Sequence, residues 1–295
     1  MAELLPLLVV VGPTASGKTE LAMQLCERQG GEIVSADSVQ VYRHFDIGTA
    51  KPSSAERARA RHHLIDIADP TEPLDAARWA ELADHAVRDI IARGKLPVVC
   101  GGTFLWVRAL LYGLTPAPPA SEALRLRHRE LVAEHGRAKL HQELAAIDPL
   151  TAARLAPNDF VRVSRALEVY ELTRVPMSRW QEQHGFRTAR YAPRLVGLEH
   201  SRDQLDQRIA ARVDRMLALG LRDEVRSLIA RGFADTRAMG SVGYKQVRLA
   251  EATATPEPGL RDAIVRATRI FARRQRTWLR EQPVQWVTSS HEVSA

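Results

Sequence analysis

Residues 12–19 carry the clearest chemistry in this sequence. They fit the pattern G-x-x-x-x-G-K-[ST] without substitution, and they follow an apolar run, residues 7–11, that is typical of a buried strand. A helix-like segment, residues 20–29, comes directly afterwards. In such a loop the backbone N–H groups turn inward around a phosphate, and the N-terminus of the following helix adds partial positive charge. The pattern predicts a phosphate-binding loop, whose members are Gly12, Pro13, Thr14, Ala15, Ser16, Gly17, Lys18 and Thr19.

Two side chains at the end of this loop are expected to bind phosphate directly or through a metal ion. Lys18 places a point charge beside the terminal phosphate oxygens. The Thr19 hydroxyl can take one position on Mg²⁺, an ion that keeps most of its waters, so we expect Mg²⁺ as a cofactor. The loop does not identify the phosphorylated compound, and a nucleotide such as ATP is one option. The intact spacing disfavours the alternative, a glycine-rich turn that only joins a strand to a helix.

Polar residues follow two further apolar runs. Asp37 comes directly after residues 32–36, and residues 101–103 follow the run 96–100. Because ligands gather beyond the carboxyl ends of parallel strands, we expect these residues to lie near the phosphate-binding loop. The Asp37 carboxylate can bind Mg²⁺ or act as a base, although Asp is also a favoured N-cap of a short helix. The two glycines at 101 and 102 allow close approach of a ligand or of the backbone, and Thr103 offers a hydroxyl.

The last long helical segment, about 259–280, carries a row of arginines. They recur at three- and four-residue steps and so share one face: Arg266, Arg269, Arg273, Arg276 and Arg280. The opposite, apolar face is expected to hold Leu260, Ile264, Ala267, Phe271 and Trp278. Clustered guanidinium groups match a phosphate backbone, whereas like charges at this spacing repel unless an anion offsets them. We therefore favour nucleic acid as the partner over a solvated basic face.

The rest of the chain indicates one sheet with a helical insertion. A Pro-rich segment, residues 115–120, predicts a domain boundary, and from about 121 to 191 only helical signals occur. Residues 195–198 again resemble a strand. We predict an α/β fold, a P-loop NTPase-like parallel sheet flanked by helices, with an all-helical insertion domain. The predicted core comprises residues 1–115 and 192–295, with a mostly helical C-terminal part, and the predicted insertion comprises residues 116–191.

One helix of the insertion carries charges that have two interpretations. It is expected over residues 158–173, with Asn158 as its N-cap. Arg162, Arg165 and Glu168 fall on one face by three-residue spacing. This face is either a binding face or a solvated one, and the sequence leaves both open.

Composition limits the class of protein and its partners. The chain has 295 residues, of which 45% are hydrophobic and 26% charged, as in an ordinary globular protein. Its net charge of +7 suggests an anionic partner or merely a basic surface. Cys26 and Cys100 lie in apolar runs, which fits buried thiols in a reducing compartment without a metal-ligand cluster. We find no signal-peptide pattern and no run that would span a bilayer, so we expect a cytoplasmic protein. Separately, we expect a monomer.

Taken in order, these motifs resemble the bacterial tRNA dimethylallyltransferase (isopentenyl-tRNA transferase) family. The matching segments run through nearly the whole chain. They are residues 12–19, 35–42, 48–52, 62–66, 101–103, 165–168, 242–246 and 273–279. The phosphate-binding loop alone would be unspecific, whereas the ordered set is highly specific.

The resemblance implies transfer of a dimethylallyl group from dimethylallyl diphosphate to N6 of the adenosine 3′-adjacent to the tRNA anticodon. It also implies that the phosphate-binding loop holds the diphosphate of this donor rather than ATP. An exocyclic adenine amine is a poor nucleophile, so it needs a base; Asp37 is the candidate, and Thr103 would orient the amine. Lys18 and Arg212, the latter on a predicted helix over 203–219, would stabilise charge on the departing diphosphate.

The family pattern further implies contacts with tRNA, whose target base must leave the anticodon loop to react. The insertion would close over the anticodon arm. The residues expected to contact tRNA are Asp37, Ser38, Val39, Gln40, Thr103, Val161, Arg162, Val163, Ser164, Arg165, Gly240, Ser241, Val242, Gly243, Tyr244, Lys245, Arg273 and Arg276. Two other classes compete with this interpretation: a P-loop small-molecule kinase using ATP, and a nucleotide-gated RNA-binding protein without catalytic activity.

Overall fold

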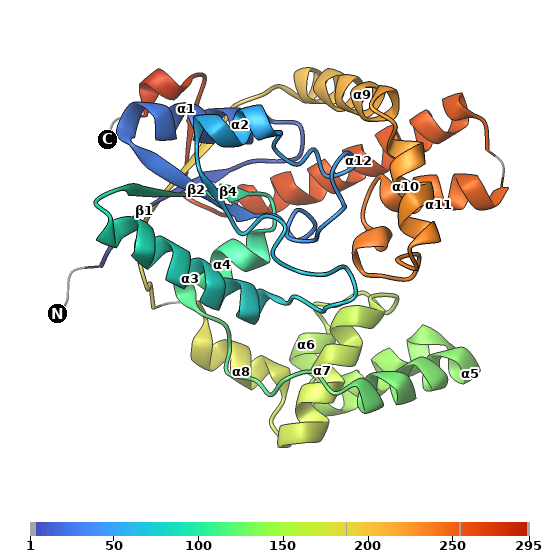
Figure 1. Ribbon diagram of the computed structural model, residues 1–295. Coiled ribbons are helices and arrows are strands. Elements are labelled where there is room, and N and C mark those ends of the chain that lie inside the picture. Colours follow the sequence, from blue (N-terminus) through green and yellow to red (C-terminus); the bar gives the residue numbers. More distant parts are fainter. Residues whose placement is uncertain (1–3, 187, 254, 294–295) are drawn as a thin grey trace. The chain divides into compact units, whose positions relative to one another are not determined.

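The computed structural model describes residues 4–186, 188–253 and 255–293. The chain forms two compact units (Figure 1). One consists of Met1–Tyr112 and Ala189–Ala295, and the other of Gly113–Thr188. We call them the core unit and the helical unit.

The core unit contains a six-stranded sheet in which neighbouring strands are parallel. The strand order is β3-β2-β4-β1-β5-β6. The strands are β1 (Pro6–Val11), β2 (Gly31–Ala36), β3 (His62–His63), β4 (Leu96–Gly101), β5 (Ala192–Leu198) and β6 (Val284–Val287). The central strand β1 pairs with β4, where Val10 lies opposite Cys100, and with β5, where Val10 lies opposite Val196. The α/β fold with a parallel sheet is therefore confirmed.

Helices cover both faces of this sheet, because alternate apolar residues of the central strands point to opposite sides (Figure 1). On one face Val10 lies in a buried cluster with Leu21 and Leu25 of α1 (Lys18–Gln29). On the other face, α3 (Ala76–Ala92) and α4 (Phe104–Tyr112) contact β2 and β4. There Trp79 of α3 is fully buried, and its indole Nε1 donates a hydrogen bond to the Ser35 carbonyl at 3.1 Å.

The remaining elements of the core unit are mostly helices that follow β5. They are α9 (Arg202–Ala218), α10 (Leu221–Ala230), η1 (Ala238–Gly240), α11 (Tyr244–Thr253), α12 (Glu257–Leu279) and η2 (Ser290–Glu292), with α2 (Ser54–Arg59) earlier in the chain. A capping box of Ser201 and Gln204 fixes the start of α9, which packs against α12. No helix in the described part of the chain is long and apolar enough to cross a bilayer.

The helical unit has its own small core, and its described residues contain no strand. Its helices are α5 (Glu122–Ile147), α6 (Pro149–Ala152), α7 (Phe160–Thr173) and α8 (Met177–His184). Gly136, with φ 80° and ψ 166°, interrupts α5 with a kink. The expected N-cap of α7 was wrong. Asp159 rather than Asn158 caps this helix, because its carboxylate accepts the backbone N–H of Arg162 at 3.3 Å.

Candidate active site

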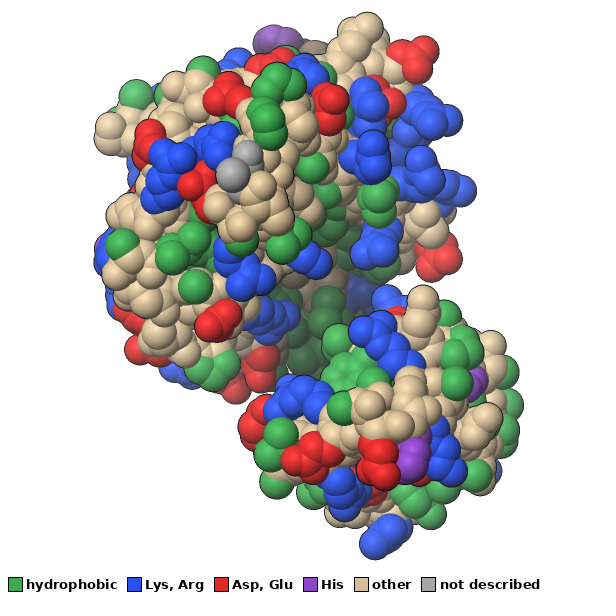
Figure 2. Space-filling model, turned by 90° about the vertical axis from the view of Figure 1, so that its right-hand side faces the viewer, with side chains coloured by type: hydrophobic (Ala, Val, Ile, Leu, Met, Phe, Trp, Pro, Cys, Tyr) green, Lys and Arg blue, Asp and Glu red, His purple; other side chains and the backbone are tan. Residues whose placement is uncertain are grey.

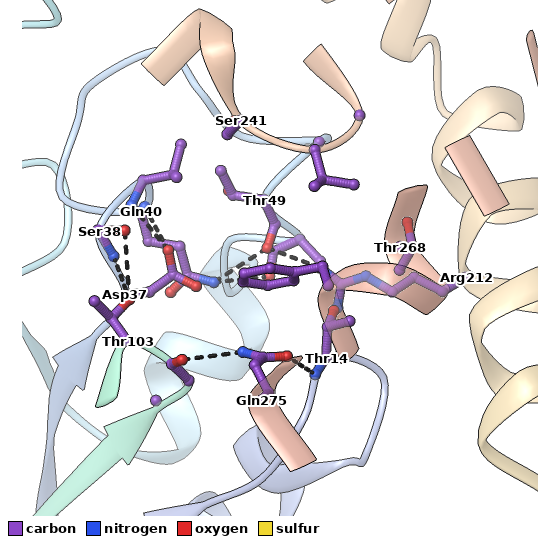
Figure 3. Close-up of a pocket in the computed structure, with 18 of the residues that line it drawn as sticks. Thr14, Asp37, Ser38, Gln40, Thr49, Thr103, Arg212, Ser241, Thr268 and Gln275 are labelled. Carbon is purple, nitrogen blue, oxygen red and sulfur yellow. Dashed lines mark hydrogen bonds between the residues drawn. The ribbon is translucent and has the colours of Figure 1, made fainter. Parts of the chain in front are cut away.

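A pocket lies in the core unit at the carboxyl ends of β1, β2 and β4 (Figure 3). The three strand ends supply the phosphate-binding loop, the turn after Asp37 and the loop that carries Thr103, while α9 and α12 complete the wall. Lys18, Asp37, Thr103 and Arg212 all line this one pocket. The structure thus brings together side chains that the sequence placed near one another only by the rule for parallel sheets.

The phosphate-binding loop has the backbone geometry that an anion requires. Ala15 and Gly17 both have positive φ, at 64° and 88°, and α1 begins directly afterwards at Lys18. The backbone N–H groups of Lys18 and Thr19, in the first turn of α1, have no hydrogen-bond partner among the described residues. Free amide groups at a helix N-terminus attract negative charge. The Arg208 side chain supports the loop, since its Nε donates to the Ala15 carbonyl at 2.8 Å.

Two half-buried cations, Lys18 and Arg212, lie at this loop, and neither forms an ion pair within the described residues. Burial lowers the pKa of Lys18 from its ordinary value, and its Nζ donates a hydrogen bond to the Pro13 carbonyl at 3.3 Å. Burial also lowers the pKa of Arg212, whose Nη2 donates to the Thr49 carbonyl at 3.1 Å. Buried charge is costly unless an opposite charge is near. The two cations together can therefore stabilise an anion with more than one charge.

Asp37 lies on the other side of the pocket, and one of its two carboxylate oxygens accepts hydrogen bonds from the backbone. Its Oδ1 accepts the backbone N–H groups of Val39 at 2.9 Å and Gln40 at 3.2 Å. The carboxylate therefore caps a turn, and the alternative that it caps a helix is wrong because no helix follows. Within the described residues Oδ2 accepts no hydrogen bond, so it is available to a ligand. The positive charges of Lys18 and Arg212 lie close enough to interact with this carboxylate.

Thr103 lies beside the Asp37 turn because β2 and β4 approach each other closely. A Cβ atom on Gly101 would stand 2.1 Å from the Ala36 carbonyl oxygen, so only glycine fits there. The Thr103 hydroxyl accepts the backbone N–H of Ser38 at 3.1 Å and lies 3.4 Å from the Ser38 hydroxyl. Its proton can therefore point to Ser38 or to a ligand in the pocket.

The loop after Asp37, residues 46–51, closes the pocket and is fixed from several elements. The Gln40 side chain donates to the carbonyls of Thr49 at 3.2 Å and Ala50 at 3.4 Å. The fully buried Tyr244 donates its hydroxyl proton to the Glu224 carboxylate at 2.5 Å and accepts the Gly48 N–H at 3.1 Å. The chain around Ser241, which lines the pocket, is therefore joined to this loop through buried hydrogen bonds.

The α12 helix differs in part from its predicted faces. Its buried residues are Leu260, Ile264, Val265, Thr268, Ala272, Gln275 and Leu279. Phe271, expected on the buried face, is 41% exposed and lines the pocket. Arg273 and Arg276 are exposed, without an ion pair among the described residues, and both line a basic groove between α9 and α12. Figure 2 shows basic side chains gathered along one flank of the core unit.

Comparisons with known proteins identify the family. The model of the IPP transferase family matches residues 40–282, which is most of the chain. The chain belongs to this family. It is 62% identical over 281 residues to the tRNA dimethylallyltransferase of Sorangium cellulosum, covering 95% of this chain and 90% of the relative. It is 50% identical over 293 residues to that of Anaeromyxobacter dehalogenans strain 2CP-1, covering 98% and 95%.

Solved structures of IPP transferases agree with the fold. The full-length tRNA isopentenylpyrophosphate transferase from Bacillus halodurans is 37% identical, with a TM-score of 0.70 over 98% of this chain and 91% of that one. A eukaryotic dimethylallyltransferase acting on tRNA is 26% identical, with a TM-score of 0.79, covering 93% of this chain and 70% of that one. The predicted family is thus confirmed.

The residues of α7 that are expected to contact tRNA differ in how far their side chains are exposed. Val161 is 75% exposed, and Arg162 is exposed beside Asp159. Val163 and Ser164 are buried. Arg165 is turned inward, where it donates to the fully buried Glu168 at 2.7 Å. The interpretation of this face as wholly solvated is therefore wrong for Arg165 and Glu168.

Three of the residues expected to contact tRNA have side chains that face the protein interior. The side chains of Val163 and Ser164 in the helical unit and of Tyr244 in the core unit are buried in this structure. Buried side chains can shape the backbone that meets RNA, but they do not offer a surface to it. Lys245, next to Tyr244, is exposed.

Sequence reasoning missed Gln275 as a residue of the site. It is 5% exposed, lines the pocket and hydrogen-bonds two of the loops described above. One signal could have found it. Gln275 lies at helical spacing between Ala272 and Leu279, so it is a polar residue on the buried stripe of α12. A buried amide needs partners, and such a position therefore merits attention.

Proposed function

We propose that this chain transfers the dimethylallyl group of dimethylallyl diphosphate to N6 of the adenosine 3′-adjacent to the anticodon of a tRNA, releasing diphosphate. The observation that carries the proposal is one pocket with two half-buried cations, Lys18 and Arg212, on the side opposite the carboxylate of Asp37. Such an arrangement suits a reaction in which an anion departs on one side and a proton is accepted on the other. Relatives named for this activity support it.

At the donor end, the amides of the phosphate-binding loop and the two cations would bind the diphosphate. Thr19 lines the same pocket, and the described residues contain no cluster of three or more His, Cys, Asp or Glu side chains that would hold a metal by themselves. Mg²⁺ takes most of its ligands from water and phosphate, and the Thr19 hydroxyl would supply one protein ligand to it. When bound, Mg²⁺ neutralises charge on the diphosphate.

At the acceptor end, Asp37 and Thr103 would act on the adenine amine. The N6 lone pair forms the new bond to C1 of the dimethylallyl group, and the C1–O bond breaks with its electron pair leaving on the diphosphate. Asp37 accepts the amine proton through Oδ2, because Oδ1 is held by the turn. The Thr103 hydroxyl would orient the amine, as its own position is fixed by the Ser38 N–H.

The partner is proposed to be the anticodon arm of tRNA. Exposed basic residues of the core unit, Arg273, Arg276 and Lys245, would neutralise its phosphates. In the helical unit, Val161 and Arg162 present exposed side chains. Since the substrate is tRNA, we expect the enzyme to act in the cytoplasm, and we expect a monomer.

Radiolabelled donor separates this proposal from its rivals. The protein is incubated with Mg²⁺, dimethylallyl diphosphate labelled in the prenyl chain, and tRNA that lacks the modification. The label is expected in the tRNA, in the nuclease fragment that contains the adenosine next to the anticodon. Transfer of the γ-phosphoryl group of ATP to a small molecule, with no label in RNA, would contradict the proposal and favour a kinase.

A further inference from the structure

Gln275 joins the two loops between which the reaction is proposed to occur. Its Oε1 accepts the backbone N–H of Thr14 at 2.8 Å, and its Nε2 donates to the Gly102 carbonyl at 3.0 Å. Figure 3 shows Gln275 between Thr14 in the phosphate-binding loop and the strand end that carries Thr103. Because a carboxamide is planar and rigid, its acceptor and donor hold both partners at a fixed separation.

The surroundings of this amide are adapted to it. Thr14 follows β1 and Gly102 follows β4, two strands that are neighbours in the sheet. A Cβ atom at Gly102 would stand 2.4 Å from Nε2 of Gln275, so the amide reaches the Gly102 carbonyl only because this residue has no side chain. Gly102 and Gln275 are therefore complementary parts of one contact.

The contact also connects both loops to the helix that carries exposed arginines. Gln275 lies on the buried side of α12, whereas Arg273 and Arg276 are exposed on the same turn. A helix moves as a stiff unit over so short a distance. A nucleic acid held by those arginines and a diphosphate held by the loop would thus both be positioned relative to the backbone of α12.

We propose that Gln275 is a positioning residue that sets the separation between the diphosphate-binding loop and the strand end bearing Thr103. It contacts no reacting atom itself. The proposal rests on the proposed function, since it assigns the donor to one loop and the acceptor amine to the other. Bond formation requires the reacting atoms to be about 3–3.5 Å apart, and a misplacement of about 1 Å can cost on the order of 100-fold in rate.

The first test compares three substitutions on α12. Gln275→Leu keeps most of the side-chain volume and removes both hydrogen bonds. Gln275→Glu keeps an acceptor for Thr14. Val265→Ala is the matched control, because Val265 is buried on the same helix and does not line the pocket. We measure kcat and KM for prenyl transfer, the Kd for tRNA, and the melting temperature of each variant.

The expected result separates positioning from stability. Gln275→Leu should lower kcat by about 10–100-fold, with the Kd for tRNA within about twofold of the unsubstituted protein. Val265→Ala should lower the melting temperature while kcat stays within about twofold. Unchanged kcat in Gln275→Leu would overturn the inference. The inference would also be overturned if Gln275→Leu and Val265→Ala lost the same factor in kcat while their melting temperatures fell by the same amount.

The pH dependence of kcat in Gln275→Glu separates positioning from a merely structural role, which would leave that dependence unchanged. A deprotonated carboxylate accepts the Thr14 N–H but cannot donate to the Gly102 carbonyl, whereas a protonated carboxyl group does both. Its kcat, divided by that of the unsubstituted protein at the same pH, should therefore rise as pH falls from 8.5 toward 6. A ratio that does not change with pH would contradict the inference.

A double-mutant cycle gives an independent check. The methyl group of Gly102→Ala would displace the amide, so it should lower kcat, and adding Gln275→Leu should cost little more. Multiplicative losses would show that the two residues act separately, against the inference. If the unsubstituted protein transfers no prenyl group to tRNA, the proposed function fails; if it does and the variants match it, only the role of Gln275 fails.

Discussion

Replacing Asp37 with Asn separates the proposed catalytic role of this side chain from its structural role in the turn. Asn retains an oxygen that can accept the N–H groups of Val39 and Gln40, which Asp37 Oδ1 accepts at 2.9 and 3.2 Å. It has no basic oxygen to receive a proton. General-base catalysis contributes about 10²–10⁴-fold, so we expect the transfer rate to fall by that factor, equivalent to about 3–5 kcal/mol in the barrier.

The stability of the two Asp37 variants should differ while their rates agree. Because the turn is preserved, Asp37→Asn should unfold within about 0.5 kcal/mol of the unsubstituted protein. Asp37→Ala loses the cap as well and should cost about 1 kcal/mol, by analogy with helix N-caps. Urea unfolding at neutral pH measures both. Single-turnover transfer with saturating tRNA measures the chemical step without interference from binding.

Binding of inorganic diphosphate with Mg²⁺ distinguishes a base from a metal ligand. Removing the negative charge of Asp37 beside Lys18 and Arg212 leaves those cations freer to attract an anion. If Asp37 is the base, the variant Asp37→Asn should bind diphosphate as tightly as before or more tightly. Weaker binding would assign Asp37 to the metal, and a transfer rate within tenfold of the unsubstituted protein would refute its role as the base.

Three further substitutions test other parts of the structure. Arg273→Ala should reduce the slope of log Kd for tRNA against log salt concentration by about one unit. Arg261→Ala is the control, because the Arg261 guanidinium is paired with Asp214, and it should change the slope less. Equal slopes in the two variants would show that Arg273 contacts no phosphate. Tyr244→Phe removes the hydroxyl that bonds Glu224 and Gly48 and should cost about 0.5–1.5 kcal/mol in urea unfolding, with unchanged stability the contrary result. Glu32→Gln removes the negative charge that Arg93, Lys95 and His63 share and should cost about 1.5–3 kcal/mol at pH 7. Hydrogen bonding from Arg93 lowers the pKa of Glu32, so this stability is present above the ordinary carboxyl pKa and is lost as pH falls below it. The difference between the Glu32→Gln variant and the unsubstituted protein should therefore shrink at pH 3–4, and a constant difference would contradict the assignment.

The sequence predicted the parts of the fold that depend on local pattern. Apolar runs identified β1, β2, β4 and β5, because strands buried on both faces are almost continuously hydrophobic. The edge strand β6 was not predicted. It has four residues, of which Trp286 is 41% exposed, so it resembles a loop in the sequence.

Features that depend on tertiary contacts were harder to predict. Phe271 and Trp278 look equivalent on an isolated helix, yet Trp278 stacks on Phe104 with ring centroids 4.1 Å apart, while Phe271 faces the pocket. The partners of Gln275 lie 173 and 261 positions away in sequence, so no local pattern relates them. The motif residues of the pocket could be predicted, whereas the side chains that hold its loops in place could not.

The central claim is that the loop around Lys18 binds a prenyl diphosphate within reach of a tRNA adenine. Intact mass spectrometry of unmodified tRNA, after incubation with the protein, Mg²⁺ and dimethylallyl diphosphate, tests it most directly. We predict a mass increase of one dimethylallyl group replacing one hydrogen, located at the adenosine beside the anticodon and absent with Lys18→Ala. A tRNA of unchanged mass under these conditions would contradict the claim.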